Sequence, residues 1–189
     1  MDSEYTFQSL QGKKVLIIGD VGTGKTTLTL KLLEEAIRTG FGNRITVIDM
    51  APAIVEAKGM RVGGKLLGLS DQLKETKYLT PIGVETPRLK AKSAKELLYL
   101  VNLNEKQIGP LLKKYIKNPT PILFINDISI YLQSGVDEHI SSAIRAAETF
   151  IANGYYGEAF KEDFGTGVTN RERRLMRKII ENVDVLIEL

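Results

Sequence analysis

A glycine-rich segment near the start of the chain has the residue types and spacing of a phosphate-binding loop. Residues 19–26 read GDVGTGKT, which fits G-x-x-x-x-G-K-[ST], and they lie between an apolar run and a helical pattern. Backbone amides of such a loop and the positive end of the helix bind anions. The pattern predicts that Lys25 reaches the β- and γ-phosphates of a nucleoside triphosphate and that the Thr26 hydroxyl binds Mg²⁺. The expected nucleotide-binding residues are Gly19, Asp20, Val21, Gly22, Thr23, Gly24, Lys25, Thr26 and Thr27.

Two carboxylates follow apolar runs that have the composition of strands. Asp127 ends the run PILFIND, and Asp49 lies in the run at residues 45–50, which Pro52 closes. A strand that follows the helix of the loop can end beside the γ-phosphate, where Asp49 could orient water or activate a substrate hydroxyl. The alternative for Asp49 is a capping role before Pro52. Lys25, Asp49 and Asp127 are therefore the predicted catalytic residues.

Other polar residues could complete the site. Arginines cluster at residues 171–174, after a glycine-rich stretch, and an arginine there could neutralise charge in a transition state. Arg171 and Arg174 are accordingly predicted phosphate sensors, with a solvated basic face as the alternative. Asn153, at the end of a later strand, could sense the γ-phosphate.

The elements that must position these residues alternate between strand and helix. Apolar runs predict strands at 15–18, 45–50, 121–127, 149–153 and 183–189. Helical periodicity is present at 26–39, 94–115, 141–147 and 170–181. The spacing of the first two strands favours a crossover to a parallel neighbour. The alternation predicts an α/β, three-layer fold with a mainly parallel sheet of about five strands flanked by helices.

Local signals refine this arrangement. Thr169 to Glu172 has the S/T-x-x-E form of a capping box, which predicts a helix start there. Pro110 could kink or split the helix at 94–115. Periodicity fades at about 53–92, where glycine and proline recur, and we expect an insertion that covers the site or binds a second substrate. A surface excursion is the alternative.

Composition limits the class of protein. The 189 residues are 43% hydrophobic, so we expect one domain over 1–189. The net charge of +3 is too small to argue for nucleic acid by itself. There is no cysteine, the first ten residues lack the apolar core of a secretory signal, and no apolar run is long enough for a membrane span. These features predict a cytoplasmic protein.

Through the GDVGTGKT loop and the alternating pattern, the chain resembles the P-loop NTPase superfamily, and the loop is similar to its Walker A motif. The resemblance implies that Asp127 is the Walker B aspartate, which holds Mg²⁺ through water; an ordinary aspartate at a strand end is the alternative. It implies ATP as the nucleotide. GTP is less expected, because no N/T-K-x-D motif follows. Ile128 stands where AAA-type ATPases carry a glutamate, which argues against a motor ATPase.

Two groups within the superfamily share further features with the chain. The order VIDMAP, FINDISIYL, FIANGYYG and VDVLIEL is similar to the RecA- and KaiC-like ATPases, although Ala51 stands where their catalytic glutamate is expected. GDVGTGKTTL followed by a strand ending in aspartate resembles the polynucleotide 5′-kinase group, and MRVGGKLLG echoes the glycine-rich segment of that group. In those kinases the aspartate of the second strand can activate the accepted hydroxyl, a role that would fall to Asp49.

These features predict an ATP-binding protein and leave three hypotheses for what it does. A slow or partner-stimulated Mg²⁺-dependent ATPase would use Asp49 to position water. A phosphotransferase acting on a nucleoside or polynucleotide would use Asp49 on an acceptor held by the insertion. A nucleotide-dependent switch or assembly subunit would respond by changing conformation, with a protein partner or a second copy.

Overall fold

The computed structural model describes residues 5–57 and 59–189, and its centre is a six-stranded sheet. The strands are β1 (Lys14–Gly19), β2 (Ile45–Asp49), β5 (Lys77–Leu79), β6 (Ile122–Asn126), β7 (Thr149–Tyr155) and β8 (Val185–Glu188). Their order is β5-β2-β6-β7-β1-β8, and every pairing among them is parallel. The predicted α/β class is confirmed. The sheet has a sixth strand because β5, from within the expected insertion, pairs with β2.

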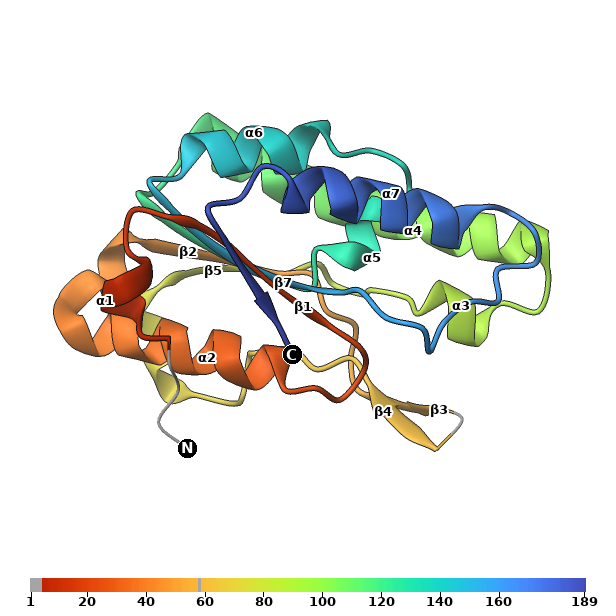
Figure 1. Cartoon of the computed structure of the whole chain (residues 1–189), viewed down its shortest axis with the longest axis horizontal. Coiled ribbons are helices and arrows are strands. Elements are labelled where there is room, and N and C mark those ends of the chain that lie inside the picture. Colours follow the sequence, from red (N-terminus) through yellow and green to blue (C-terminus); the bar gives the residue numbers. More distant parts are fainter. Residues whose placement is uncertain (1–4, 58) are drawn as a thin grey trace.

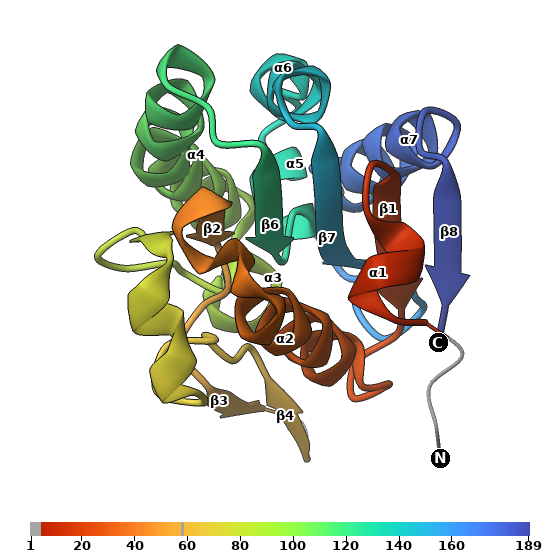
Figure 2. The same cartoon turned by 90° about the vertical axis from the view of Figure 1, so that its left-hand side faces the viewer.

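Helices cover both faces of this sheet (Figure 1, Figure 2). One face carries α4 (Ala94–Lys117), α5 (Ser129–Leu132), α6 (Glu138–Ala146) and α7 (Val168–Ile180), and the other carries α1 (Phe7–Leu10) and α2 (Lys25–Ala36). Successive strand residues point to opposite faces, so Leu16 and Ile18 join the core under α4 and α6, whereas Val15 and Ile17 join the core against α2. A strand buried on both faces is expected to be apolar, as β1 is at residues 15–18.

The prediction that the second strand neighbours the first is wrong, because β6 and β7 lie between β2 and β1. Every residue of β6 is buried, and so is all of β7 except its last residue, which suits the centre of a sheet covered on both sides. Asp49, at the end of β2, is consequently separated from β1 by two strands. Across the described residues, we find no helix whose length and hydropathy would let it span a lipid bilayer.

The segment at 53–92 has secondary structure of its own. It contains an antiparallel hairpin, a 3-10 turn, the edge strand and a short helix: β3 (Val55–Ala57), β4 (Met60–Val62), Asp71–Glu75, β5 and α3 (Pro87–Lys90). In the views of Figures 1 and 2 the hairpin extends away from the sheet near the start of α2. After it, α4 runs as one helix with Pro110 inside, so the proline does not split it.

The predicted capping box at the start of α7 is wrong. The helix begins at Val168 with Gly167 as its N-cap, which places Thr169 inside the first turn. Its amide donates instead to Asp163 Oδ2 at 3.0 Å, so the cap comes from the preceding loop. Glu172 then falls on the inward face of the helix, where it is buried.

Candidate functional site

The carboxyl ends of the central strands surround a cavity, as expected for an open parallel sheet. Five segments line it. They are the loop after β1 (Val21, Gly22, Lys25, Thr26), the residues after β2 (Ala51, Pro52), the 53–92 segment (Val62, Gly63, Gly64, Thr86, Pro87, Arg88, Leu89), the region after β6 (Asn126, Asp127, Ser129, Ile130, Gln133), and β7 with its following loop (Asn153, Tyr155, Phe160). One cavity therefore brings the predicted phosphate-binding loop against the predicted insertion.

The loop after β1 adopts a backbone that depends on its glycines. Gly22 and Gly24 have φ angles of 77° and 95°, a region that side chains with a Cβ rarely enter. Gly24 is the N-cap of α2 and offers no side-chain cap, so the amides of the first turn have no acceptor from a capping side chain. Such a helix end can bind an anion when one is present.

Asp20 ties this loop to the loop after β7. Its carboxylate accepts hydrogen bonds from the amides of Val21 at 2.7 Å and Glu158 at 2.9 Å. These bonds, that from Glu158 first, lower the pKa of Asp20 and keep the carboxylate charged. A Cβ at Gly157 would lie 2.4 Å from Asp20 Cγ, so glycine is required there for this close approach.

Lys25 lines the cavity and folds back onto its own loop. Its amine donates to the Asp20 carbonyl and lies 3.5 Å from Thr23 Oγ1. Partial burial lowers the pKa of Lys25, while the negative charges of Asp127 and Asp20 oppose that shift. The Lys25 amine therefore interacts both with its own loop, through Asp20, and with the charge of Asp127 after β6.

Asp127 follows β6 in a left-handed conformation with φ of 62°. Its amide donates to Asn153 Oδ1 at 2.9 Å, and its Oδ1 accepts from Ser129 Oγ at 2.5 Å. Loss of hydration raises the pKa of Asp127, and the Ser129 hydrogen bond, Lys25 and Arg88 oppose this. Thr26 also lines the cavity, so a hydroxyl and a carboxylate, ligand types that Mg²⁺ prefers, are available at one site.

Asp49 has a different environment from Asp127. It is fully buried and does not belong to the cavity wall. Its carboxylate accepts hydrogen bonds from the Leu66 amide at 2.6 Å, Asn126 Nδ2 at 2.8 Å, the Ala51 amide at 3.2 Å and the Tyr78 hydroxyl. All four donors belong to the protein, so in this conformation the carboxylate is occupied in holding residues 51, 66, 78 and 126 together. A catalytic role for Asp49 stays a prediction.

The remaining predicted residues separate into two groups. Asn153 lines the cavity, but its amide donates to Thr29 Oγ1 and Asn126 Oδ1, both within the protein. Arg171 lies outside the wall and donates to the carbonyls of Gln133 and Ser134 at 3.4 and 3.3 Å. Arg174 is exposed on α7 and does not line the cavity either, and Thr27 is also exposed.

The sequence reasoning missed Arg88. This residue of α3 lines the cavity and forms an ion pair with Glu172, whose position in the sequence is 84 residues away. A local pattern cannot reveal a pair at that separation. The available signals were one arginine directly after Pro87 in the irregular stretch, and a glutamate on what proved to be the inward face of α7.

Comparison with known proteins gives a short match. The chain is 58% identical over 36 residues to a polyribonucleotide 5′-hydroxyl-kinase of Pyrococcus abyssi, and the matched segment covers 19% of this chain and 10% of that kinase. No family model matches the chain. The short match to this kinase and the parallel sheet flanked by helices together fit a P-loop fold.

Proposed function

We propose that this protein is a Mg²⁺-dependent phosphotransferase that moves the γ-phosphoryl group of ATP to a hydroxyl of a nucleoside or polynucleotide. One observation supports it above the others: a single cavity is lined both by the loop at 21–26 and by the 53–92 segment. Such a cavity presents a candidate phosphate-donor loop on one wall and a candidate acceptor surface on the other. The short match to a kinase that acts on polyribonucleotide 5′-hydroxyls agrees with this reaction class.

The proposed roles follow from position and charge. The amides at the start of α2 and the Lys25 amine bind the β- and γ-phosphates, replacing the Asp20 carbonyl as the partner of Lys25. Thr26 and Asp127 would hold Mg²⁺, Asp127 through water, and the bound ion would supply neutralisation of phosphate charge. Asn153 fixes the position of Asp127, because its Oδ1 accepts a hydrogen bond from the backbone amide of Asp127. The other residues of the loop, from Gly19 to Thr27, shape this phosphate site.

The transfer step needs little covalent participation by the protein. The acceptor oxygen bonds to the γ-phosphorus as the bond to the β–γ bridging oxygen breaks, which leaves the nucleoside diphosphate. The hydroxyl proton passes to water. Catalysis then depends on holding donor and acceptor in line and on neutralising charge. We assign Asp49 to the support of this arrangement, through its bonds to Leu66 and Asn126.

Water in place of the acceptor would make the same site a slow ATPase. The carboxylate of Asp49 is occupied by protein donors, so we expect neither reaction to use it as a general base. The preference for transfer over hydrolysis rests on the 53–92 segment in the cavity wall. GTP is a less expected donor. A nucleotide-dependent switch, acting with a protein partner or a second copy, would need the same nucleotide site. A measurement of ATP turnover distinguishes it from both reactions, because a switch binds ATP without needing rapid turnover.

The test uses ATP labelled at the γ-phosphate, Mg²⁺, and a 5′-hydroxyl oligonucleotide, an oligonucleotide already phosphorylated at its 5′ end, or no acceptor. We expect label on the 5′-hydroxyl oligonucleotide and slow phosphate release without an acceptor. Lys25→Ala should abolish both, since the lysine binds the transferred group. Label found only as inorganic phosphate would support the ATPase instead. Turnover unchanged in Lys25→Ala would overturn the proposal.

A further inference from the structure

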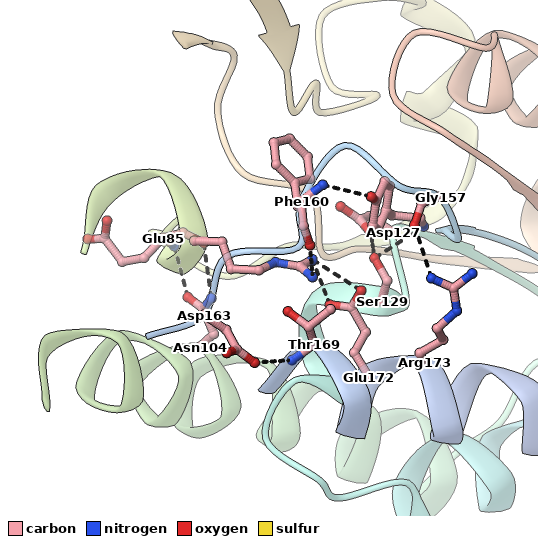
Figure 3. Close-up of polar contacts among 12 residues, drawn as sticks. Glu85, Asn104, Asp127, Ser129, Gly157, Phe160, Asp163, Thr169, Glu172 and Arg173 are labelled. Carbon is pink, nitrogen blue, oxygen red and sulfur yellow. Dashed lines mark hydrogen bonds and ion pairs between the residues drawn. The ribbon is translucent and has the colours of Figure 1, made fainter. Parts of the chain in front are cut away.

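Arg88 occupies an unusually constrained place in the cavity wall. Its side chain is only 7% exposed, yet the residue lines the cavity. Nη2 donates to both carboxylate oxygens of Glu172, at 2.9 and 3.1 Å, and Nη1 donates to the Phe160 carbonyl at 3.2 Å. The guanidinium also lies 5.4 Å from the ring centroid of Tyr155 and 5.7 Å from that of Phe160. Figure 3 shows Glu172 and Phe160 on the two elements that meet at this point, with Asp127 and Ser129 beside them.

The backbone that carries Arg88 is fixed as well. Asn104 of α4 is fully buried. Its side-chain oxygen accepts a hydrogen bond from the backbone amide of Glu85 at 2.8 Å, and its side-chain nitrogen donates to the Glu85 carbonyl at 3.0 Å (Figure 3). Glu85 lies three residues before Arg88. Helix α4, helix α7 and the loop after β7 therefore all contribute to the position of one guanidinium group.

This much structure is more than stability requires. A buried ion pair stabilises a fold weakly, because the desolvation of both charges offsets their attraction, and an apolar pair of similar volume often does as well. The guanidinium carries more N–H donors than its contacts to Glu172 and Phe160 use. Its charge also opposes the rise in the pKa of Asp127, as that of Lys25 does, and both cations line the same cavity. A cation held in this way at a cavity wall is suited to a ligand of opposite charge.

We propose that Arg88 binds a phosphoryl group in the cavity and that Glu172 is its positioning residue. The phosphoryl group is either the γ-phosphate of ATP or a phosphate already present on the acceptor, and a guanidinium can donate two parallel hydrogen bonds to either. The inference rests on the proposed function, since it names the residue that meets phosphate opposite the 21–26 loop. Arg88 thereby takes the role predicted for Arg171 and Arg174.

The test compares affinities rather than activity alone. The double variant R88Q/E172Q removes both charges and leaves no unpaired buried charge, R88K keeps the positive charge without the planar fork, and R145Q on the exposed face of α6 is the matched control. Circular dichroism establishes that each variant is folded. Calorimetry gives the ratio of the ADP and ATP dissociation constants with Mg²⁺. A transfer assay gives the ratio of KM values for a nucleoside and for its 3′-monophosphate.

If Arg88 binds the γ-phosphate, R88Q/E172Q should lower the preference for ATP over ADP by about tenfold or more, as expected for the loss of a charge-assisted hydrogen bond. R88K should give a smaller loss. If Arg88 binds an acceptor phosphate, the preference for the 3′-monophosphate should fall by a similar factor while the ATP preference is retained. Either result supports the inference. Both ratios within twofold of the wild type would overturn it, and a wild type that prefers neither ATP nor the 3′-monophosphate would do the same. A wild type that does not bind ATP would overturn the proposed function itself.

Discussion

Substitution of Asp49 by alanine separates a structural carboxylate from a catalytic one. The side chain is fully buried, and its four hydrogen-bond donors come from β6, β5 and the loops at 51 and 66. Alanine removes the acceptor and leaves those donors in place. The amide of Leu66 and one N–H of Asn126 are buried and lose their partner, since the other Asn126 bond, to the Gly64 carbonyl, uses a different N–H.

The size of the effect follows from these contacts. A buried donor without an acceptor costs about 1–3 kcal/mol, and bonds to a charged acceptor are at the upper end of that range. Two such donors, with a smaller contribution from Ala51, predict a loss of about 3–5 kcal/mol in the free energy of unfolding. A loss of this size is a large share of the free energy of unfolding of an ordinary domain. Residues 64–66 should also move, which we expect to raise the KM of the acceptor.

Denaturant unfolding followed by circular dichroism measures this loss, and the transfer assay gives kcat and KM separately. The matched control is Asp127→Asn, which removes the charge of the other strand-end aspartate while keeping a residue that tolerates its left-handed backbone. We expect the control to unfold within about 1 kcal/mol of the wild type. The side-chain hydrogen bond that it alters is the one from Ser129, and the burial that disfavours the charge of Asp127 offsets the attraction of that charge to Lys25 and Arg88. If Asp49→Ala proved as stable as the wild type and lost more than about a hundredfold in kcat at saturating substrates, Asp49 would be the general base and our reasoning would fail.

Three further predictions concern the cavity and its supports. Asp127→Asn should raise the Mg²⁺ concentration needed for half-maximal transfer, because a neutral amide is a weaker partner for the ion; an unchanged Mg²⁺ titration would contradict the assignment. Burial raises the pKa of Glu172 to about 7, so the folded state retains a proton that the unfolded chain releases near its ordinary value of 4.5. The resulting stability is present below that value and is lost as the pH rises through about 7. Glu172→Gln should therefore become more stable relative to the wild type, by up to about 3 kcal/mol, between pH 4.5 and 8, and a pH-independent difference in unfolding free energy would refute this. Gly157→Ala should weaken ATP binding by about tenfold, since its Cβ would displace Asp20, whereas Gly83→Ala, with open space around the Cβ position, should bind ATP as the wild type does; equal dissociation constants for the two variants would argue against the role of Asp20.

Much of the fold could be predicted from local pattern because its central strands are mostly apolar. β1, β2, β6 and β7 are almost entirely buried, so each appears in the sequence as a run dominated by apolar residues. The exception is β5, whose three residues include Lys77 and Tyr78. An edge strand has one neighbour and partial exposure, so its sequence need not be apolar, and it was included in the irregular segment.

The start of α7 shows the limit of local signals. Thr169 and Glu172 have the spacing of a capping box, but Asp163 caps the helix from the preceding loop, and Glu172 pairs with Arg88. Both partners are set by the tertiary structure. A motif of two residues cannot predict contacts that depend on where a separate loop and a separate helix pack.

The two strand-end aspartates show the same limit at the site. Asp49 ends β2 and Asp127 directly follows β6, and the carboxyl edge of the sheet brings both near the cavity. Their environments differ because residues 64–66 and Tyr78 cover Asp49, whereas a left-handed turn leaves Asp127 on the cavity wall. Strand-end position therefore identifies the candidates, and the packing of the 53–92 segment distinguishes between them.

A chain of buried side-chain hydrogen bonds connects the two sides of the cavity. Asn126 donates to Asp49 Oδ1 and accepts from Asn153 Nδ2 at 2.9 Å, and Asn153 in turn donates to Thr29 of α2 at 2.8 Å and fixes the amide of Asp127. Buried polar chains of this kind are stable only when every member keeps its partner. A movement of the 53–92 segment that broke the hydrogen bonds of Asp49 would therefore also disturb the bonds of Thr29 in α2 and of Asp127. For this reason we expect substitutions at Asn126 to alter the KM of both substrates, whereas substitutions at Arg88 should alter recognition of phosphate alone.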